Sequence, residues 1–377
     1  MNEKKQVIGI DVSMLVYQGS GVANYTYNMV KHLLLLDQKN EYKLFYSSFR
    51  RPKNFYYLDE FRSLGAKVFD YKFPPRILEL FWNKWHILPV ELLIGKVDWY
   101  FSSDFLRPPL FKNTKGITTI HDLTWKVFPQ FHTKKIVDAH HKKMNLTIKS
   151  GDFIIADSKS TANDIIKFYP QVIGHNKVEI INPGIDDRFR IIKNDKEITN
   201  VLKKYNVVYP HKYLLYVGAI EPRKNLDTAI KIFSELIKDS LYSDFEFLIV
   251  GRAGWKNEQI FELIKKLNLE NKIKFIGFVE DDDLPYFYNA CSVNIYLSKY
   301  EGFGLPPVEA AACGKQTLLY SNSSLGELFP NSKMYAKKGE ELEQLKKLIK
   351  NNFAHKETTF TWNSFVKKIL NVIECNL

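Results

Sequence analysis

Short apolar runs bounded by turn residues alternate with longer amphipathic stretches along the whole chain. Such runs are typical of buried strands, and the intervening periodicity predicts helices, for example over residues 22–36. The regular alternation of the two patterns predicts an α/β fold built from parallel sheets. The expected strands are 6–13, 42–48, 66–71, 97–101, 116–122, 152–158 and 178–184 in the first half, and 212–220, 246–251, 272–279, 292–298 and 316–321 in the second.

The pattern breaks once in the middle of the chain, between Asn182 and Val201, where Pro, Gly and charged residues replace the periodicity. We interpret this stretch as an interdomain linker, because a chain of 377 residues suits two domains better than one. The expected domains are 1–185 and 186–355. Residues 356–377 contain an amphipathic helix that no later strand uses, and we expect it to pack against the other domain.

Charge adds a functional hint, because the formal net charge of +12 is unevenly distributed. Residues 1–185 hold 26 Lys and Arg against 17 Asp and Glu. The densest stretch contains Arg107, Lys112, Lys115, Lys126, Lys134, Lys135, Lys142, Lys143 and Lys149 against only Asp122 and Asp138. This excess favours an anionic partner for the first half, and a merely solvated basic face is the alternative.

Other compositional features narrow the class of protein. No apolar run approaches the roughly 20 residues that a membrane span needs, and the first residues lack the pattern of a secretory signal. We therefore expect a cytoplasmic protein. Cys291, Cys313 and Cys375 lack metal-ligand spacing, so reduced thiols are expected and a metal site is not.

The most informative motif is the sequence YEGFGLPPVEAAACGK over residues 300–315, directly after an expected strand. Its glycines permit a tight turn, and Pro306 and Pro307 suit the first turn of a helix. The amides of Phe303, Gly304 and Leu305 would then favour a phosphate. Glu301 before the turn and Glu309, expected in the first helical turn, supply strong acceptors for sugar hydroxyls. The motif therefore suggests a ligand with phosphate in the middle and sugars at both ends. The alternative is that Glu301 is only a charged loop residue and Glu309 only an acidic residue near the helix N-terminus.

A second motif, YVGAIEPRKNLDTAI over residues 216–230, places Arg223 and Lys224 between a strand and a helix. Adjacent cations at the carboxyl end of a parallel strand are positioned for a diphosphate. An exposed loop pair is the alternative, and Glu221 is a candidate counter-ion.

In the first half, Gly19 and Gly21 follow the first strand and precede a helix, as in loops that bind phosphate. Asn24 breaks the full dinucleotide fingerprint, so a plain turn remains open. His121 and Asp122 end an expected strand, where they are placed to contact a sugar hydroxyl, unless His121 is a buried structural residue.

Two further features are open at this stage. Residues 73–95 interleave Trp82 and Trp85 with basic residues, which suits either contact with an anionic membrane surface or core packing. His140 and His141 lie on a Lys-rich helical stretch, where we expect both to be at the surface.

Taken together, EGFGLPPVEAAACGK, YVGAIEPRKNL, the GSGV loop and IHDL resemble the family 4 retaining glycosyltransferases of the GT-B fold. The resemblance covers nearly the whole chain, and the two glutamates are its most specific part. Within that family the chain looks like bacterial O-antigen and polysaccharide mannosyltransferases, partly through HDLTWKVFPQFH. Gln316 and Thr317 depart from the Pro-Val pair of many relatives, and we expect little effect on chemistry.

The resemblance implies a nucleotide-sugar donor, with GDP-mannose the first guess, and no metal or other cofactor. Glu301 would contact the donor sugar, Glu309 the ribose, and Arg223 with Lys224 the diphosphate. His121 would lie beside the transferred sugar and join Glu301 and the two cations as a catalytic residue. The remaining donor contacts would come from Gly19 and Gly21 in the first domain and from Phe278, Val279, Phe303, Gly304 and Leu305 in the second.

The same resemblance implies an acceptor bound by the first domain, a glycan or a lipid-diphosphate-linked glycan at the membrane face. The last helix would return to that domain. A GT-B sugar-nucleotide epimerase, a catalytically inactive scaffold and a basic nucleic-acid-binding protein are the alternatives, and no nucleic-acid motif supports the last.

Overall fold

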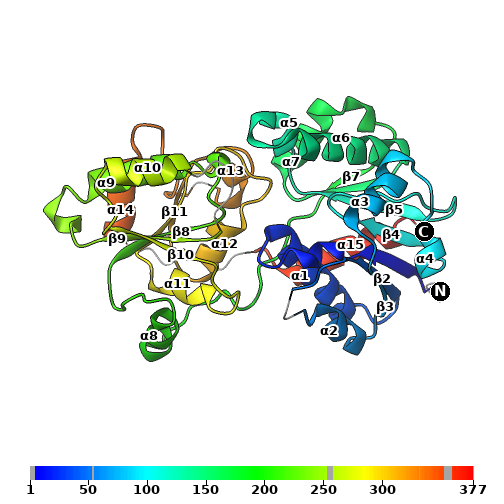
Figure 1. Cartoon of the computed structure of the whole chain (residues 1–377), viewed down its shortest axis with the longest axis horizontal. Coiled ribbons are helices and arrows are strands. Elements are labelled where there is room, and N and C mark those ends of the chain that lie inside the picture. Colours follow the sequence, from blue (N-terminus) through cyan, green and yellow to red (C-terminus); the bar gives the residue numbers. More distant parts are fainter. Residues whose placement is uncertain (1–4, 53–54, 253–257, 331, 352–358, 377) are drawn as a thin grey trace. The chain divides into compact units, whose positions relative to one another are not determined.

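The computed structural model describes residues 5–52, 55–252, 258–330, 332–351 and 359–376. It folds as two compact units, Met1–Gly184 with Phe360–Leu377, and Ile185–Thr359. Each unit is built around one parallel sheet with helices on its faces (Figure 1). The predicted α/β class is therefore confirmed.

The sheet of the first unit has seven strands in the order β3-β2-β1-β4-β5-β6-β7, and every neighbouring pair is parallel. Each strand overlaps an expected one. The apolar runs of β1, β2, β4, β5 and β6 are largely buried, as in a sheet covered on both faces, whereas the edge strands β3 and β7 are more exposed. The strands are β1 (Val7–Asp11), β2 (Glu41–Ser47), β3 (Lys67–Tyr71), β4 (Trp99–Ser102), β5 (Lys115–Ile120), β6 (Phe153–Ala156) and β7 (Val178–Ile180).

The α-helices of this unit are α1 (Gly21–Leu36), α2 (Tyr57–Ser63), α3 (Pro75–Leu78), α4 (Glu91–Ile94), α5 (Thr124–Val127), α6 (Lys134–Lys149), α7 (Lys159–Phe168) and α15 (Trp362–Glu374). One-turn 3-10 helices span Ser13–Val16, Pro129–Phe131 and Pro170–Val172, and a π-helix spans Glu79–Lys84.

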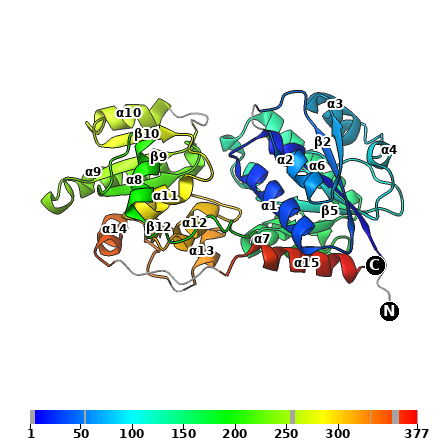
Figure 2. The same cartoon turned by 90° about the horizontal axis from the view of Figure 1, so that it is seen from below.

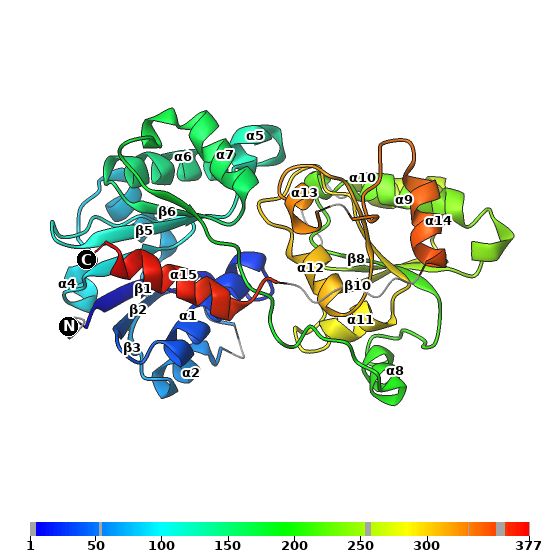
Figure 3. The ribbon, with the colours of Figure 1, turned by 180° about the vertical axis from the view of Figure 1, so that it is seen from behind.

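The last helix, α15, packs beside α1 (Figure 3). Trp362 and Phe365 lie edge-on to Tyr25 of α1, with ring centroids 5.7 and 5.6 Å apart. Gly184 lies against the start of α15, where a Cβ atom would come within 2.1 Å of the Trp362 nitrogen. The expected return of the C-terminal helix to the first unit is thus confirmed.

The stretch 73–95 packs into the core in part, and its contact with a membrane surface stays a prediction. Trp82 of the π-helix is fully buried against Phe45, with ring centroids 5.2 Å apart. Trp85 and Ile87, just after the π-helix, are 53% and 50% exposed. The segment therefore fixes itself to the core with one tryptophan and presents the other to solvent.

The sheet of the second unit has five parallel strands in the order β10-β9-β8-β11-β12. The chain order β8, β9, β10, then β11 and β12 on the other side, is that of a Rossmann-like sheet. Its strands are β8 (Tyr213–Val217), β9 (Glu246–Val250), β10 (Ile273–Gly277), β11 (Val293–Tyr296) and β12 (Thr317–Leu319).

Helices cover both faces of this second sheet (Figures 1 and 2). Contacts join α9 with α10 and α14, and α11 with α8 and α12. The α-helices are α8 (Asp195–Lys203), α9 (Leu226–Leu236), α10 (Glu258–Lys266), α11 (Leu284–Ala290), α12 (Leu305–Ala312), α13 (Leu325–Leu328) and α14 (Glu341–Lys350), with 3-10 turns at Pro222–Lys224 and Ser240–Tyr242.

The expected linker is too long at its C-terminal end, because α8 already begins at Asp195. Asn194 caps this helix by accepting hydrogen bonds from the amides of Lys196 and Glu197. The buried Ile198, Val201 and Leu202 supply an apolar face that the charged surroundings hide in the sequence.

Among the described residues, no helix is both long and apolar enough to cross a membrane.

Candidate active site

The second unit brings the predicted cations to the carboxyl end of β8. The strand leads through Gly218 into the short 3-10 turn Pro222–Lys224. Asn225 ends that turn in the left-handed conformation, with φ 58°, and its side-chain amide donates to the Leu297 carbonyl at 3.0 Å. This bond ties the turn to the end of β11, so the loop is held by the sheet itself.

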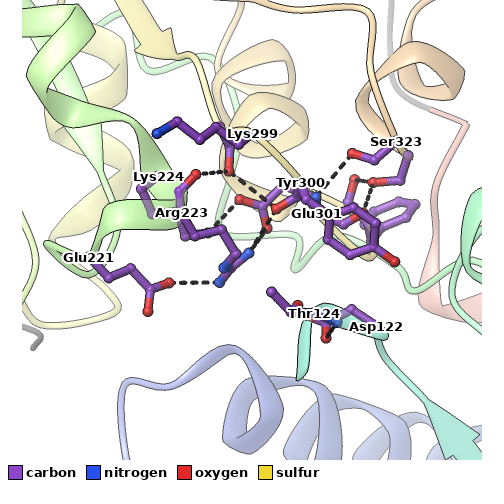
Figure 4. Close-up of polar contacts among 12 residues, drawn as sticks. Asp122, Thr124, Glu221, Arg223, Lys224, Lys299, Tyr300, Glu301 and Ser323 are labelled. Atoms are coloured by element: carbon purple, nitrogen blue, oxygen red, sulfur yellow. Dashed lines mark hydrogen bonds and ion pairs between the residues drawn. The ribbon is translucent and has the colours of Figure 1, made fainter. Parts of the chain in front are cut away.

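Arg223 and Lys224 converge there on Glu301 (Figure 4). The Arg223 guanidinium donates from Nη1 to Glu301 Oε2 at 2.8 Å, and Lys224 Nζ donates to Oε1 at 2.7 Å. The Tyr296 hydroxyl also lies 2.9 Å from Oε1 and 2.6 Å from Lys224 Nζ. Arg223 Nη2 donates to Glu221 Oε1 at 2.7 Å, as expected for a counter-ion.

The side chains of this cluster are buried, and their charges shift one another's pKa values. Burial raises the pKa of Glu301, but the charges of Arg223 and Lys224 outweigh it and hold that pKa at about 2. Burial and the neighbouring Arg223 charge lower the pKa of Lys224. All three residues were predicted from the sequence, but their direct pairing was not. With Glu221, the cluster contains two cations and two carboxylates, so a bound polyphosphate would have to compete with these carboxylates for the cations.

Glu309 has a different environment. It lies in the second turn of α12, since the helix begins at Leu305, so its expected position in the first turn was wrong by one turn. The Tyr288 hydroxyl donates to Glu309 Oε2 at 2.8 Å. Burial raises the pKa of Glu309 to about 7, with Asp281 and Asp186 adding to the shift. Tyr288 was not predicted from the sequence, because a tyrosine on an apolar helix face carries no local signal of a functional role.

Phe303, Gly304 and Leu305, also predicted to contact the donor, form the turn that leads into α12. Leu305 is the first residue of α12, as expected from the prolines, and Gly304 before it has φ 99°. Phe303 is buried, and its carbonyl accepts from the Ser324 hydroxyl at 2.9 Å. This turn therefore has the backbone conformation that begins α12, and its contact with phosphate stays a prediction.

The expected nucleobase residues differ from each other in exposure. Val279 is buried in the core, and its backbone contact with a nucleobase stays a prediction. Phe278 is 42% exposed, with the Arg252 guanidinium 5.0 Å from its ring centroid. Sequence analysis missed Arg252, although it follows β9 at the carboxyl edge, where a cation could have been noted.

In the first unit, His121 follows β5 and meets a partner from the next strand. Its Nδ1 lies 2.8 Å from Asp157 Oδ2, and Asp157 is buried. Ile120 pairs with Ala156 in the β5–β6 register, so the next residue of each strand lies side by side. The register could have suggested this pair, because both expected strands end in a polar residue. Asp122 instead accepts from the Thr124 amide at 2.9 Å.

Replacement of Asp157 by asparagine is expected to lower the pKa of His121. Burial lowers that pKa, but the Asp157 and Asp104 charges and the Asp157 hydrogen bond outweigh it, so the net shift is upward. The raised pKa of His121 therefore stabilises the fold below the ordinary pKa of histidine while Asp157 is ionised, and this contribution is lost as pH rises through the folded-state pKa of His121. Titration of the His121 ring by NMR in both proteins tests this, and an unchanged pKa would exclude the coupling.

The glycines of the GSGV loop have different structural roles. Gly19 has φ 73°, a conformation that favours glycine. Gly21 opens α1 with an ordinary φ, and a Cβ atom there would meet nothing within 4 Å. Ser20 caps the helix by accepting from the Ala23 amide at 3.2 Å. The loop therefore needs glycine at position 19 for its backbone, but not at position 21.

Gly19→Ala and Gly21→Ala are thus expected to act differently. The first should destabilise the fold by about 1 kcal/mol through left-handed strain. The second should leave the melting temperature unchanged or slightly higher, yet weaken nucleotide-sugar binding by about tenfold if phosphate approaches the helix start. Melting curves and donor affinities of both variants test this, and normal donor affinity in Gly21→Ala would remove the loop from the donor site.

Two expectations about surface charge were wrong. His140 and His141 are half-buried, since Trp125 stacks on His140 at 5.5 Å and His141 contacts the Tyr169 hydroxyl at 3.0 Å. In the basic stretch, Lys143 is 2% exposed and Arg107 is equally buried. Arg107 pairs with Asp152, and both its Nε and Nη2 donate to that carboxylate. The exposed basic charge is therefore smaller than the sequence suggested.

In the described part of the chain, no group of three or more His, Cys, Asp or Glu is placed to hold a metal ion. Cys291 and Cys313 are buried free thiols, and Cys375 is an exposed one.

Comparison with known families matches both units. The family model "Glycosyltransferase Family 4" matches residues 19–189, and "Glycosyl transferases group 1" matches residues 197–359. The chain therefore belongs to the family 4, group 1 glycosyltransferases. It is 26% identical over 327 residues to O-antigen chain mannosyltransferase B of Escherichia coli, covering 85% of this chain and 84% of that protein. It is 24% identical to O-antigen chain mannosyltransferase RfbU of Salmonella typhimurium strain LT2, over 69% of this chain and 66% of that one.

Solved structures show the same GT-B architecture. Sucrose-phosphate synthase from Thermosynechococcus elongatus superposes with a TM-score of 0.73 at 14% identity, covering 99% of each chain. WaaG, a glycosyltransferase involved in lipopolysaccharide biosynthesis, gives 0.63 at 16% identity, over 97% of this chain and 99% of that chain. The chain is thus a GT-B glycosyltransferase related to O-antigen mannosyltransferases.

Proposed function

We propose that this enzyme transfers a hexose, with mannose from GDP-mannose as the first candidate, to a glycan or lipid-linked acceptor during synthesis of a cell-surface polysaccharide. The observation that carries the proposal is the buried cluster of Arg223, Lys224 and Glu301 at the carboxyl end of β8. The names of the sequence relatives, O-antigen chain mannosyltransferases, support the sugar and the process.

In the proposed reaction, Arg223 and Lys224 bind the diphosphate, and Glu301 accepts hydrogen bonds from the hexose. The bond between the anomeric carbon and the phosphate oxygen breaks, and the acceptor hydroxyl oxygen bonds to the same face of that carbon. Its proton passes to the leaving phosphate oxygen, so the configuration is retained. Charge developing on the diphosphate is stabilised by the two cations, the largest catalytic contribution expected here. We propose, from the family resemblance alone, that His121 acts on the transferred sugar and that the reaction requires no metal.

A transfer assay tests this function. The enzyme is incubated with GDP-mannose, UDP-glucose or dTDP-rhamnose and a mannoside acceptor, with and without EDTA, and the product is analysed by NMR. We expect one donor to be used, EDTA to have no effect, and the new linkage to keep the donor's anomeric configuration. Inversion or loss of activity in EDTA would overturn the mechanism, and conversion of the donor without transfer would identify an epimerase.

We further propose that the segment 73–95 contacts an anionic membrane surface. Trp85 and Ile87 are half-exposed beside Lys84, an arrangement that suits the boundary between headgroups and acyl chains. Trp85→Gln with Ile87→Gln should reduce binding to vesicles containing anionic phospholipid by about tenfold, with little loss of stability because both side chains are exposed. Leu241→Gln, another exposed site, is the control. Equal vesicle binding by all three proteins would refute the contact.

A further inference from the structure

The loop that follows β12, residues 321–324, holds the backbone of Glu301. Because β11 and β12 pair in parallel, the loops after both strands leave the second sheet at the same edge. The Glu301 amide donates to Ser323 Oγ at 3.0 Å (Figure 4), and the Ser324 hydroxyl donates to the Glu301 carbonyl at 2.9 Å. Two consecutive serines therefore bond both backbone polar groups of Glu301.

Ser324 also holds the turn that follows Glu301. Its side chain is fully buried, and its hydroxyl lies 2.9 Å from the Phe303 carbonyl as well. The one hydroxyl proton is thus shared between two carbonyls of the same turn. Because buried carbonyls need a donor, loss of this hydroxyl would loosen the backbone on the C-terminal side of Glu301.

Ser323 has a backbone conformation that is unfavourable for serine. Its φ is 44°, in the left-handed region that glycine adopts at little cost. Such conformations persist where the surrounding structure determines them, and they concentrate at functional sites. Glycine would fit the backbone of this position better, but it would not supply the oxygen that accepts from the Glu301 amide.

The backbone that carries the two cations is held by other contacts. The Lys299 amide donates to the Arg223 carbonyl at 2.9 Å, and Asn225 donates to the Leu297 carbonyl at 3.0 Å. Both contacts reach residues that precede Glu301 in the chain. A change at Ser323 or Ser324 can therefore move Glu301 without moving the turn of Arg223 and Lys224.

We propose that Ser323 and Ser324 are positioning residues that hold Glu301 in place for the donor hexose. The inference rests on the proposed function, in which Glu301 accepts hydrogen bonds from the hexose and the cations bind the diphosphate. Hydrogen bonds weaken steeply with small errors in distance and angle, whereas attraction between charges changes more gradually with distance. Loss of either serine should therefore affect recognition of the hexose more than recognition of the diphosphate.

Isothermal titration on the full chain tests the proposal with GDP and GDP-mannose, and with UDP and UDP-glucose. Ser323→Gly removes the oxygen while glycine accommodates the backbone, and Ser324→Ala removes the buried hydroxyl. Ser321→Ala, an exposed serine of the same loop, is the matched control. For the pair that wild type binds, we expect the two variants to weaken nucleotide-sugar binding about tenfold and nucleoside-diphosphate binding less than about twofold. The control should change neither.

Melting curves of the same proteins separate positioning from general support of the fold. Equal losses of both affinities, or a lower melting temperature with both affinities unchanged, would overturn the proposal. If Ser324→Ala does not fold, Ser323→Gly decides alone, and wild-type affinity for the nucleotide sugar in that variant would overturn it. Failure of wild type to bind any nucleoside diphosphate would instead refute the proposed function, and this inference with it.

Discussion

Replacement of Lys224 by methionine is expected to lower kcat at least about a hundredfold, because in the proposed reaction this cation stabilises the leaving diphosphate. Methionine nearly preserves the length of the side chain, and Arg223 continues to neutralise Glu301 at 2.8 Å. The protein should therefore remain folded, and its affinity for nucleoside diphosphate should fall by about tenfold. Steady-state kinetics and isothermal titration measure the two effects separately.

The matched control is Lys231→Met on α9. Lys231 is exposed and forms only a surface pair with Asp227 at 3.5 Å. Removal of such a pair should change neither turnover nor stability noticeably. Equal activity of Lys224→Met and Lys231→Met would show that the buried cluster does not act on the donor.

Replacement of Glu309 by glutamine is expected to weaken donor binding by about 10- to 100-fold, because the proposed role of Glu309 is to accept hydrogen bonds from the ribose hydroxyls with a charged carboxylate. Glutamine retains an oxygen for the Tyr288 hydroxyl, which now donates at 2.8 Å, so the fold should persist. Glu309→Ala should lose donor binding and turnover as well while remaining folded. Near-normal activity of either variant would remove Glu309 from the donor site.

The pH dependence of Glu309 provides a second readout. Its pKa of about 7 lies above the model-compound value of 4.5. The folded state therefore holds an extra proton between these values, and stability falls as pH rises from about 4.5 to 7. Ribose hydroxyls prefer the ionised carboxylate, so donor affinity of the wild type should rise as pH rises through 7.

In Glu309→Gln, both pH trends should disappear. At pH 8 the variant should be more stable than wild type, by at most about 3 kcal/mol for a shift of this size. Tyr288→Phe is the complementary variant, because the Tyr288 hydrogen bond lowers the pKa of Glu309 and its loss should move the binding profile to higher pH. A flat affinity profile in wild type would show that Glu309 does not titrate in this way.

Local features of the chain were predicted well from the sequence. Strands were predictable because a short apolar run reports burial on both faces of a parallel sheet, and the start of α12 was predictable because Pro306 and Pro307 suit only a first turn. The turn at Pro222–Lys224 likewise followed from its own residues.

Contacts between distant segments could not be predicted from the sequence. Lys224 and Glu301 are 77 residues apart and meet because β8 and β11 are neighbours, an adjacency that strand prediction alone does not give. The burial of His140 depends on Trp125, and that of Arg107 on Asp152. His140 was expected at the surface and Arg107 was counted in a basic stretch open to an anionic partner, because a single segment does not reveal the residue that covers it.

The central claim is that the second unit binds a nucleotide-sugar donor through Glu301, Arg223, Lys224 and Glu309. The most direct test is the thermal shift of wild type and Glu309→Gln with GDP-, UDP- and dTDP-sugars. We expect one nucleotide, at about a hundred times its Kd, to raise the melting temperature of wild type by about 5 °C and that of the variant by much less. No shift with any donor, or equal shifts in both proteins, would contradict the account.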